Sequence, residues 1–213
     1  MDEEQRIAAC KTSVTQIIAT LRSTPQNWRS HLDLARSVMA QIDSTAFMQQ
    51  RSRVAEQTWM VAGLQRLAYA DADNGEVPEI AAWCARQWLI IYQRDPQNVE
   101  ALTGIGESWL SRAQPALSRI HRHDGSSSSS GGSSSRSAQC LSSSEEDSQS
   151  AASVLEAERR AGTADYVEAR GYLQPAIEYL DLAVAAAQTQ QALSGDLLAT
   201  VRTSFVHDLP VSG

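Results

Sequence analysis

The sequence predicts an all-α protein built from antiparallel helix pairs, and three features support this prediction. Apolar residues recur every three or four positions along most of the chain, which is the spacing of one helix face. Short connections that contain Pro, Asp or Ser separate segments of similar length, as in helical hairpins. Aromatic residues make up only 6% of the chain and dense β-branched alternation is missing, which favours helices over strands.

Two helices are expected at the start of the chain. The first spans about 4–22 and ends at Ser23-Thr24-Pro25, where Thr24 suits an N-cap and Pro25 a first helical position. The second spans about 26–42 and is followed by the polar connection 43–45. Their apolar stripes are Ile7, Cys10, Val14, Ile17 and Leu21, and then Trp28, Leu32, Ala35, Met39 and Ile42.

The next three helices follow the same logic. A long helix over about 46–70 ends before the Asn74-Gly75 turn, and a fourth begins at Pro78. Asp95-Pro96 ends the fourth helix and caps a fifth, which continues to about Arg112. A shorter helical piece covers 114–122, with Pro115 in its first turn. The inward residues of the third and fourth helices are Phe47, Val54, Val61, Leu64 and Ala68, and then Ile80, Cys84, Trp88 and Ile91.

Composition divides the chain into four parts. Residues 1–123 form a helical region, and 124–150 form a Ser- and Gly-rich acidic insertion that is expected to be disordered because it cannot bury a core. Helical patterning resumes over 151–206, most strongly over 175–192, with a last helix over about 196–206. Residues 207–213 form a flexible tail.

An internal repeat is visible: Pro25-Gln26-Asn27 recurs 71 positions later as Pro96-Gln97-Asn98, close to twice a period of about 34 residues. Around the second copy the pattern resembles that of the tetratricopeptide (TPR-like) helical-repeat family. The positions that carry the resemblance hold large and small residues in the order typical of the family and are predicted to pack the repeats: Leu102, Ile105, Gly106, Trp109, Ala176, Leu180 and Ala183.

The resemblance implies a fold in which antiparallel helix hairpins stack as a short right-handed solenoid, interrupted by the Ser-rich insertion. Another all-α array or bundle is the alternative. The match covers about half of the chain, with Ser118 where the second helix of a repeat carries alanine. Gly106 and Ala183 are then expected at close helix–helix crossings.

No catalytic, cofactor-binding or metal-binding set is predicted. His121, His123 and Asp124 lie among arginines that would repel a cation, and zinc needs three or four protein ligands. The sequence contains neither a GxSxG elbow nor a phosphate loop with GK[ST]. Cys10, Cys84 and Cys140 are widely spaced, so neither a disulfide framework nor a CxxC site is indicated.

Two other features are candidates for function. Ser142, Ser143 and Ser144 each precede an acidic residue by three positions, which resembles the target sites of acidophilic protein kinases, so they are candidate phosphorylation sites. Trp59 and Trp83 fall off the assigned stripes and belong either to a second packed face or to a binding surface.

These observations favour a non-enzymatic scaffold that binds a peptide or helix of a larger protein complex. The alternative is a structural subunit of a nuclear chromatin, transcription or recombination assembly. The net charge of −7 and the pI near 5.1 argue against direct nucleic-acid binding. No run approaches about 20 apolar residues and Met1-Asp2-Glu3-Glu4 is acidic, so no membrane partner, no signal peptide and a cytoplasmic or nuclear location are expected.

Overall fold

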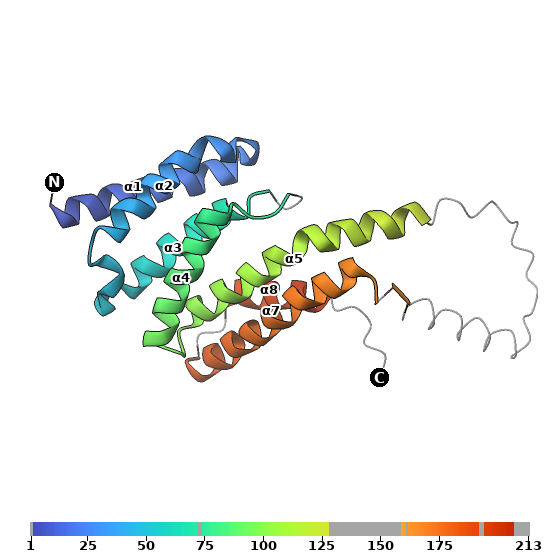
Figure 1. Ribbon diagram of the computed structural model, residues 1–213. Coiled ribbons are helices and arrows are strands. Elements are labelled where there is room, and N and C mark those ends of the chain that lie inside the picture. Colours follow the sequence, from blue (N-terminus) through green and yellow to red (C-terminus); the bar gives the residue numbers. More distant parts are fainter. Residues whose placement is uncertain (1, 72–73, 128–158, 161, 192–193, 207–213) are drawn as a thin grey trace, which may run out of the picture.

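The structure is a computed structural model that describes residues 2–71, 74–127, 159–160, 162–191 and 194–206 (Figure 1). Helices make up all of its regular structure in this part of the chain, which confirms the all-α prediction there. The α-helices are α1 (Glu3–Ser23), α2 (Leu32–Asp43), α3 (Val54–Ala68), α4 (Pro78–Arg94), α5 (Val99–Ser127), α7 (Ala164–Thr189) and α8 (Gly195–Val206). Three 3₁₀ segments accompany them: η1 (Pro25–His31), η2 (Phe47–Gln49) and η3 (Arg51–Arg53).

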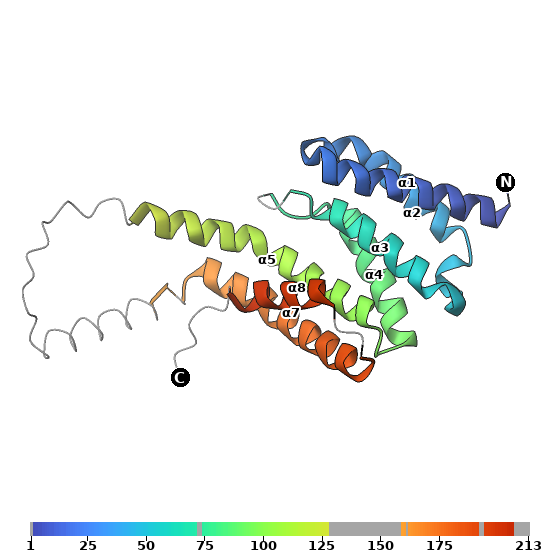
Figure 2. The ribbon, with the colours of Figure 1, turned by 180° about the vertical axis from the view of Figure 1, so that it is seen from behind.

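Successive helices pack as antiparallel pairs that lie side by side. The pairs are α1 with α2, α3 with α4, and the much longer α5 with α7 (Figures 1 and 2). Helix α1 also packs on α3, and α4 packs on α5, so each pair contacts the next. Helix α8 turns back against α7 and α5 on the side seen in Figure 2. The helix pairs are thus arranged in chain order, with the α1–α2 pair at one end and the α5–α7 pair at the other.

The core follows the apolar stripes. One continuous cluster joins the first two pairs and reaches α5, and it includes Ile17, Phe47, Leu64, Trp88 and Ile105. Smaller clusters continue between α5 and α7 and under α8. The stripe residues that the sequence places inward in the first helix, from Ile7 to Ile17, are fully buried.

Helix α3 is shorter than the helix expected over 46–70. Two 3₁₀ turns, η2 and η3, form there instead, separated by the extended residue Gln50. Gln57, which is fully buried, donates from Nε2 to the carbonyls of Phe47 at 2.6 Å and Gln50 at 2.7 Å, while its Oε1 accepts from Arg94 at 2.8 Å. The side chain of Gln57 therefore satisfies carbonyls that a helix would have used itself.

Helices α5 and α7 are longer than expected, because each continues through a proline. Helix α5 passes Pro115 without the break expected near 113, and α7 includes Pro175. A proline removes one helix hydrogen bond. The buried alanines beside Pro115, Ala113 and Ala116, pack against α7, which favours a continuous rod.

Two smaller differences concern helix starts and the insertion. Residues 25–31 are 3₁₀ rather than α-helical, and Thr24 makes no side-chain cap. Helix α5 reaches Ser127, past the predicted boundary at Asp124. The rest of the insertion, with Ser142, Ser143 and Ser144, lies outside the described residues, as does the tail 207–213.

Candidate functional site

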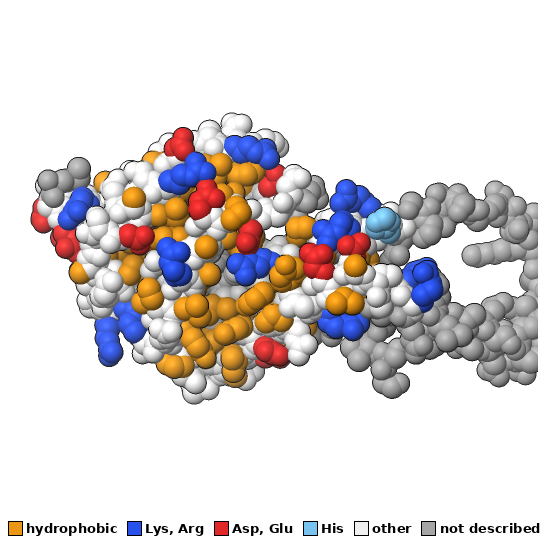
Figure 3. Space-filling model, viewed as in Figure 1, with side chains coloured by type: hydrophobic (Ala, Val, Ile, Leu, Met, Phe, Trp, Pro, Cys, Tyr) orange, Lys and Arg blue, Asp and Glu red, His pale blue; other side chains and the backbone are white. Residues whose placement is uncertain are grey.

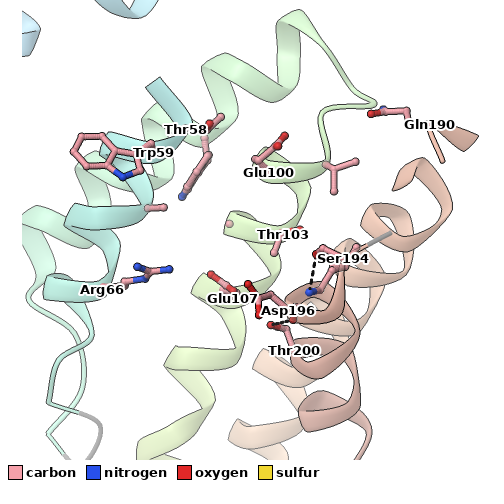
Figure 4. A pocket seen from close by; sticks show the side chains of 15 residues that line it. Thr58, Trp59, Arg66, Glu100, Thr103, Glu107, Gln190, Ser194, Asp196 and Thr200 are labelled. Atoms are coloured by element: carbon pink, nitrogen blue, oxygen red, sulfur yellow. Dashed lines mark hydrogen bonds between the residues drawn. The ribbon is translucent and has the colours of Figure 1, made fainter. Parts of the chain in front are cut away.

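A groove runs along the face shared by α3, α5 and α8. It consists of two adjoining cavities of about 410 and 400 Å³, which share the side chains of Ala62, Arg66, Glu107 and Thr200. Helix α3 forms one wall, α5 the floor and α8 the opposite wall (Figure 4). Cavities of this size fall in the range of ordinary ligand sites.

A buried glutamine joins α3, α4 and α5 beneath the groove. Gln65 on α3 accepts a hydrogen bond at 2.7 Å from the indole Nε1 of Trp88 on α4 and donates one at 2.9 Å to the carbonyl of Gly104 on α5. Any side chain at Gly104 would meet the ring of Trp88. Close packing and buried hydrogen bonds thus set the spacing between wall and floor.

Helix α8 is held in place at its start. Leu197 is buried in a cluster with Leu102, Ala183 and two further alanines of α7. The Ser194 hydroxyl accepts the Leu197 N–H at 3.2 Å, which is the hydrogen bond of a helix N-cap. These contacts bring Asp196 and Thr200 to the edge of the groove (Figure 4).

Among the residues that the structure describes, the charged side chains of the groove are three carboxylates and one guanidinium: Glu100, Glu107, Asp196 and Arg66. Arg66 and Glu107 point toward each other in Figure 4, but neither side chain has a hydrogen-bond or ion-pair partner among the described residues. Burial raises the pKa of Glu107, and the positive charge of Arg66 offsets part of that rise. The groove is therefore acidic, with a partly desolvated carboxylate in its floor.

Trp59 adds an exposed aromatic surface on α3. Its side chain is 39% exposed, whereas Trp83 and Trp88 are buried and Trp28 and Trp109 are half-buried. From the sequence, Trp59 and Trp83 could each belong to a packed face or to a binding surface. Trp83 belongs to the packing, since its Nε1 donates to Asp43 at 2.9 Å, whereas Trp59 lines the groove.

The residues of the groove suit binding through shape, stacking and charge. Within the described residues, no three His, Cys, Asp or Glu side chains gather as metal ligands would. Burial raises the pKa of the Cys84 thiol to about 12 and also raises that of Cys10, so both thiols stay protonated at neutral pH. The groups that line the groove and can contact a ligand include the exposed indole of Trp59, the unpaired carboxylates and the guanidinium of Arg66.

The predicted repeat-packing residues lie in and around the α5–α7 interface. Leu102, Gly106, Ala176, Leu180 and Ala183 are buried there, and a Cβ on Gly106 would lie 2.7 Å from Cγ of Leu180. Ile105 is buried in the main core. Trp109 is half-buried, with its ring centroid 6.2 Å from that of Tyr172.

Sequence reasoning missed Arg66, Glu100 and Glu107 as site residues. A polar stripe was present in α5, where Glu100, Thr103 and Glu107 recur at helical spacing between apolar positions. It could not be distinguished from an ordinary solvated face, because only the positions of α3 and α8 turn it into a groove floor.

On the face of Figure 3, hydrophobic side chains gather where α4, α5 and α7 meet. Exposed leucines of those helices include Leu89 and Leu182. Neither lines the two cavities described above. The groove, rather than this face, combines concavity, charge and an exposed aromatic ring.

The helices that the structure describes include none with the length and apolarity needed to span a membrane. In comparisons with known proteins, the chain matches no protein-family model, no curated protein and no solved structure.

Proposed function

We propose that this protein is a non-enzymatic interaction scaffold, in which the groove between α3, α5 and α8 binds a peptide segment or a helix of a partner protein. The proposal includes a TPR-like arrangement, in which the hairpins stack as a short right-handed solenoid. Helices α3, α5 and α8 would then be the first helices of successive pairs. Stacked helix pairs present extended concave surfaces of this kind to their ligands.

The observation that carries the proposal is the position of Trp59. A tryptophan side chain gains much from burial, yet this one is 39% exposed on the wall of a groove. Tryptophan is enriched among the residues that dominate binding energy in protein interfaces. A partner that covers Trp59 would bury its exposed apolar surface, and the free energy gained would stabilise the complex.

Affinity purification with mass spectrometry, using the full-length protein as bait, tests this proposal. Wild type is compared with Trp59→Ala and with Leu182→Ala, which removes an exposed apolar side chain from α7 away from the groove. We expect Leu182→Ala to keep the wild-type partners and Trp59→Ala to lose them. A purified partner should then bind Trp59→Ala at least about 30-fold more weakly, the effect of a hot-spot residue.

Folding is checked by circular dichroism and a thermal melt of each variant, because an unfolded variant would lose partners for another reason. Both replaced side chains are exposed, so both variants should melt close to wild type. Retention of the same partners by folded Trp59→Ala would contradict the proposed function.

A further inference from the structure

The groove carboxylates differ from most other charged groups of the folded chain. Elsewhere arginines pair with carboxylates at 2.7–2.8 Å, as Arg53 does with Glu4, Arg112 with Glu76 and Arg119 with Asp165. The side chains of Glu100, Glu107 and Asp196 have no ion-pair or hydrogen-bond partner among the described residues. Three carboxylates and one guanidinium, that of Arg66, line the described part of the groove, which therefore offers more negative charge than the chain compensates.

Glu107 is the member of this set that gains most from a ligand cation. It lies in the floor of the cavity, flanked in sequence by the buried residues Gly106 and Ser108, and burial raises its pKa. A carboxylate that is partly removed from water and has no hydrogen-bond donor loses solvation energy, and a charged donor offsets that loss. Arg66, whose side chain is largely exposed, leaves the carboxylate with no direct hydrogen bond.

The groove also fixes where an apolar contact would lie relative to this carboxylate. Trp59 and Arg66 are seven residues apart on α3, which is about 10 Å along a helix. In Figure 4, Arg66 lies beside Glu107 while Trp59 lies farther along α3, near the level of Glu100. The aromatic surface of Trp59 and the half-buried carboxylate of Glu107 are thus separated along the groove by about two helical turns.

We propose that the segment bound in the groove carries a lysine or arginine that reaches Glu107, with a large apolar residue about 10 Å away along the segment, against Trp59. This inference rests on the proposed function and names the chemistry of its partner. The three carboxylates draw the cation in and would repel a phosphate backbone or an acidic peptide. In a helical partner the two residues stand about two turns apart, and in an extended one about three residues apart.

The test is a selection of random 12-residue peptides displayed on phage against purified full-length protein. The same selection is run on Trp59→Ala, Glu107→Gln and Glu178→Gln, the last removing one exposed carboxylate of α7 outside the groove. We expect wild type and Glu178→Gln to enrich peptides with a basic and a large apolar residue. Glu107→Gln should enrich the apolar residue alone, and Trp59→Ala should enrich neither.

Synthetic versions of the selected peptides then give dissociation constants by fluorescence anisotropy. Replacing the basic residue of the peptide by glutamine should weaken binding to wild type by about tenfold or more, and should have little further effect on Glu107→Gln. Glu107→Gln is expected to fold, because burial already favours the uncharged form of this side chain. A double variant, Glu100→Gln with Asp196→Asn, changes only exposed groups and should weaken binding in the same direction.

The outcomes separate the two proposals. If wild type selects no peptide whose binding depends on Trp59, the proposed function fails and this inference fails with it. If peptides depend on Trp59 but lack a basic residue, or bind Glu107→Gln as tightly as wild type, the inference fails and the proposed function stands. Should Glu107→Gln fail to fold, the double variant decides, and unchanged affinity there overturns the inference.

Discussion

Three glycines set the distances between helices, because each lies where a neighbouring side chain leaves no space for a Cβ. A Cβ on Gly63 of α3 would lie 2.6 Å from Val14 of α1, and one on Gly104 would meet Trp88. A Cβ on Gly106 would lie 2.7 Å from Cγ of Leu180. At distances under 3.0 Å either the neighbouring side chain or the helix itself must shift.

Gly106→Leu is therefore expected to destabilise the protein by about 1–3 kcal/mol, the usual effect of overpacking. The matched control is Gly171→Leu on α7, where a Cβ would have nothing within 4 Å. Leucine there should be neutral or stabilising by up to about 1 kcal/mol, because it favours the helix. Urea unfolding of both variants measures the two effects. A neutral or stabilising Gly106→Leu would contradict the close α5–α7 crossing.

The sequence could indicate Gly106 but not the buried glutamines. The order of large and small residues from Leu102 to Trp109 is local, so it can be read from the chain directly. Gln57 and Gln65 gain their role from carbonyls and an indole on other segments, such as Gly104, which is 39 residues beyond Gln65. A polar residue on an apolar stripe gives no sign of such a distant partner.

At the scale of elements, a network of charges ties α1 to the start of α3. Glu56 of α3 accepts hydrogen bonds at 2.8 Å from Lys11 of α1 and from Arg53, and Arg53 also pairs with Glu4 of α1. The hydrogen bonds from Arg53 and Lys11 lower the pKa of Glu56 to about 2. The charged form of Glu56 is thus favoured in the folded state.

Glu56→Gln should lower the free energy of unfolding at pH 7 by about 1 kcal/mol or less, because the network is partly exposed and solvent screens it. A lowered carboxyl pKa stabilises the fold above the ordinary value near 4.5 and loses its effect as the pH falls toward 2. The difference between wild type and Glu56→Gln should therefore shrink over that range in urea unfolding. A difference in unfolding free energy that stays constant from pH 7 to pH 3 would contradict this account. The control variant Glu178→Gln, outside the network, should show no such change with pH.

The lengths of elements were harder to predict than their existence. Each expected helix of the N-terminal half has a counterpart, because stripes spaced at three and four depend only on the local chain. The boundaries at Pro115 and near 46–53 were wrong for a shared reason. Contacts with other segments determine both boundaries. Helix α7 packs beside Pro115, and Gln57 donates a hydrogen bond to the carbonyl of Phe47 in η2.

At the scale of the whole molecule, the groove exists because three helices from distant parts of the sequence meet. Trp59, Glu107 and Leu197 are far apart in the chain, and α8 returns to the face of α5 only after the α5–α7 pair is complete. The sequence predicted a scaffold that binds a peptide or helix, with Trp59 as a candidate for a binding surface, but it did not indicate the other residues of the groove. Their positions in the assembled fold, rather than any motif, place the exposed Trp59 and the unpaired Glu107 in the same groove.

The connection between α5 and α7 is expected to contribute little to the stability of the fold. Arg119 of α5 pairs with Asp165 at 2.7 Å and also with Glu168 of α7, so the two helices are held together at the end where the insertion leaves. Deleting 128–150, the part of the predicted insertion beyond α5, keeps both helices and leaves 151–163 to join them. Loop-closure entropy changes by only about 0.6 kcal/mol per doubling of length.

The deletion variant should accordingly unfold in urea within about 1 kcal/mol of wild type, with a similar dependence on urea concentration. Arg119→Ala serves as a comparison, since it removes the ion pairs between the helices and leaves the insertion intact. If the deletion costs more than about 2 kcal/mol, the loss is the size of a core truncation, and the deleted residues must pack against the helices. A Ser- and Gly-rich acidic composition offers few apolar side chains for such packing, so the smaller effect is expected.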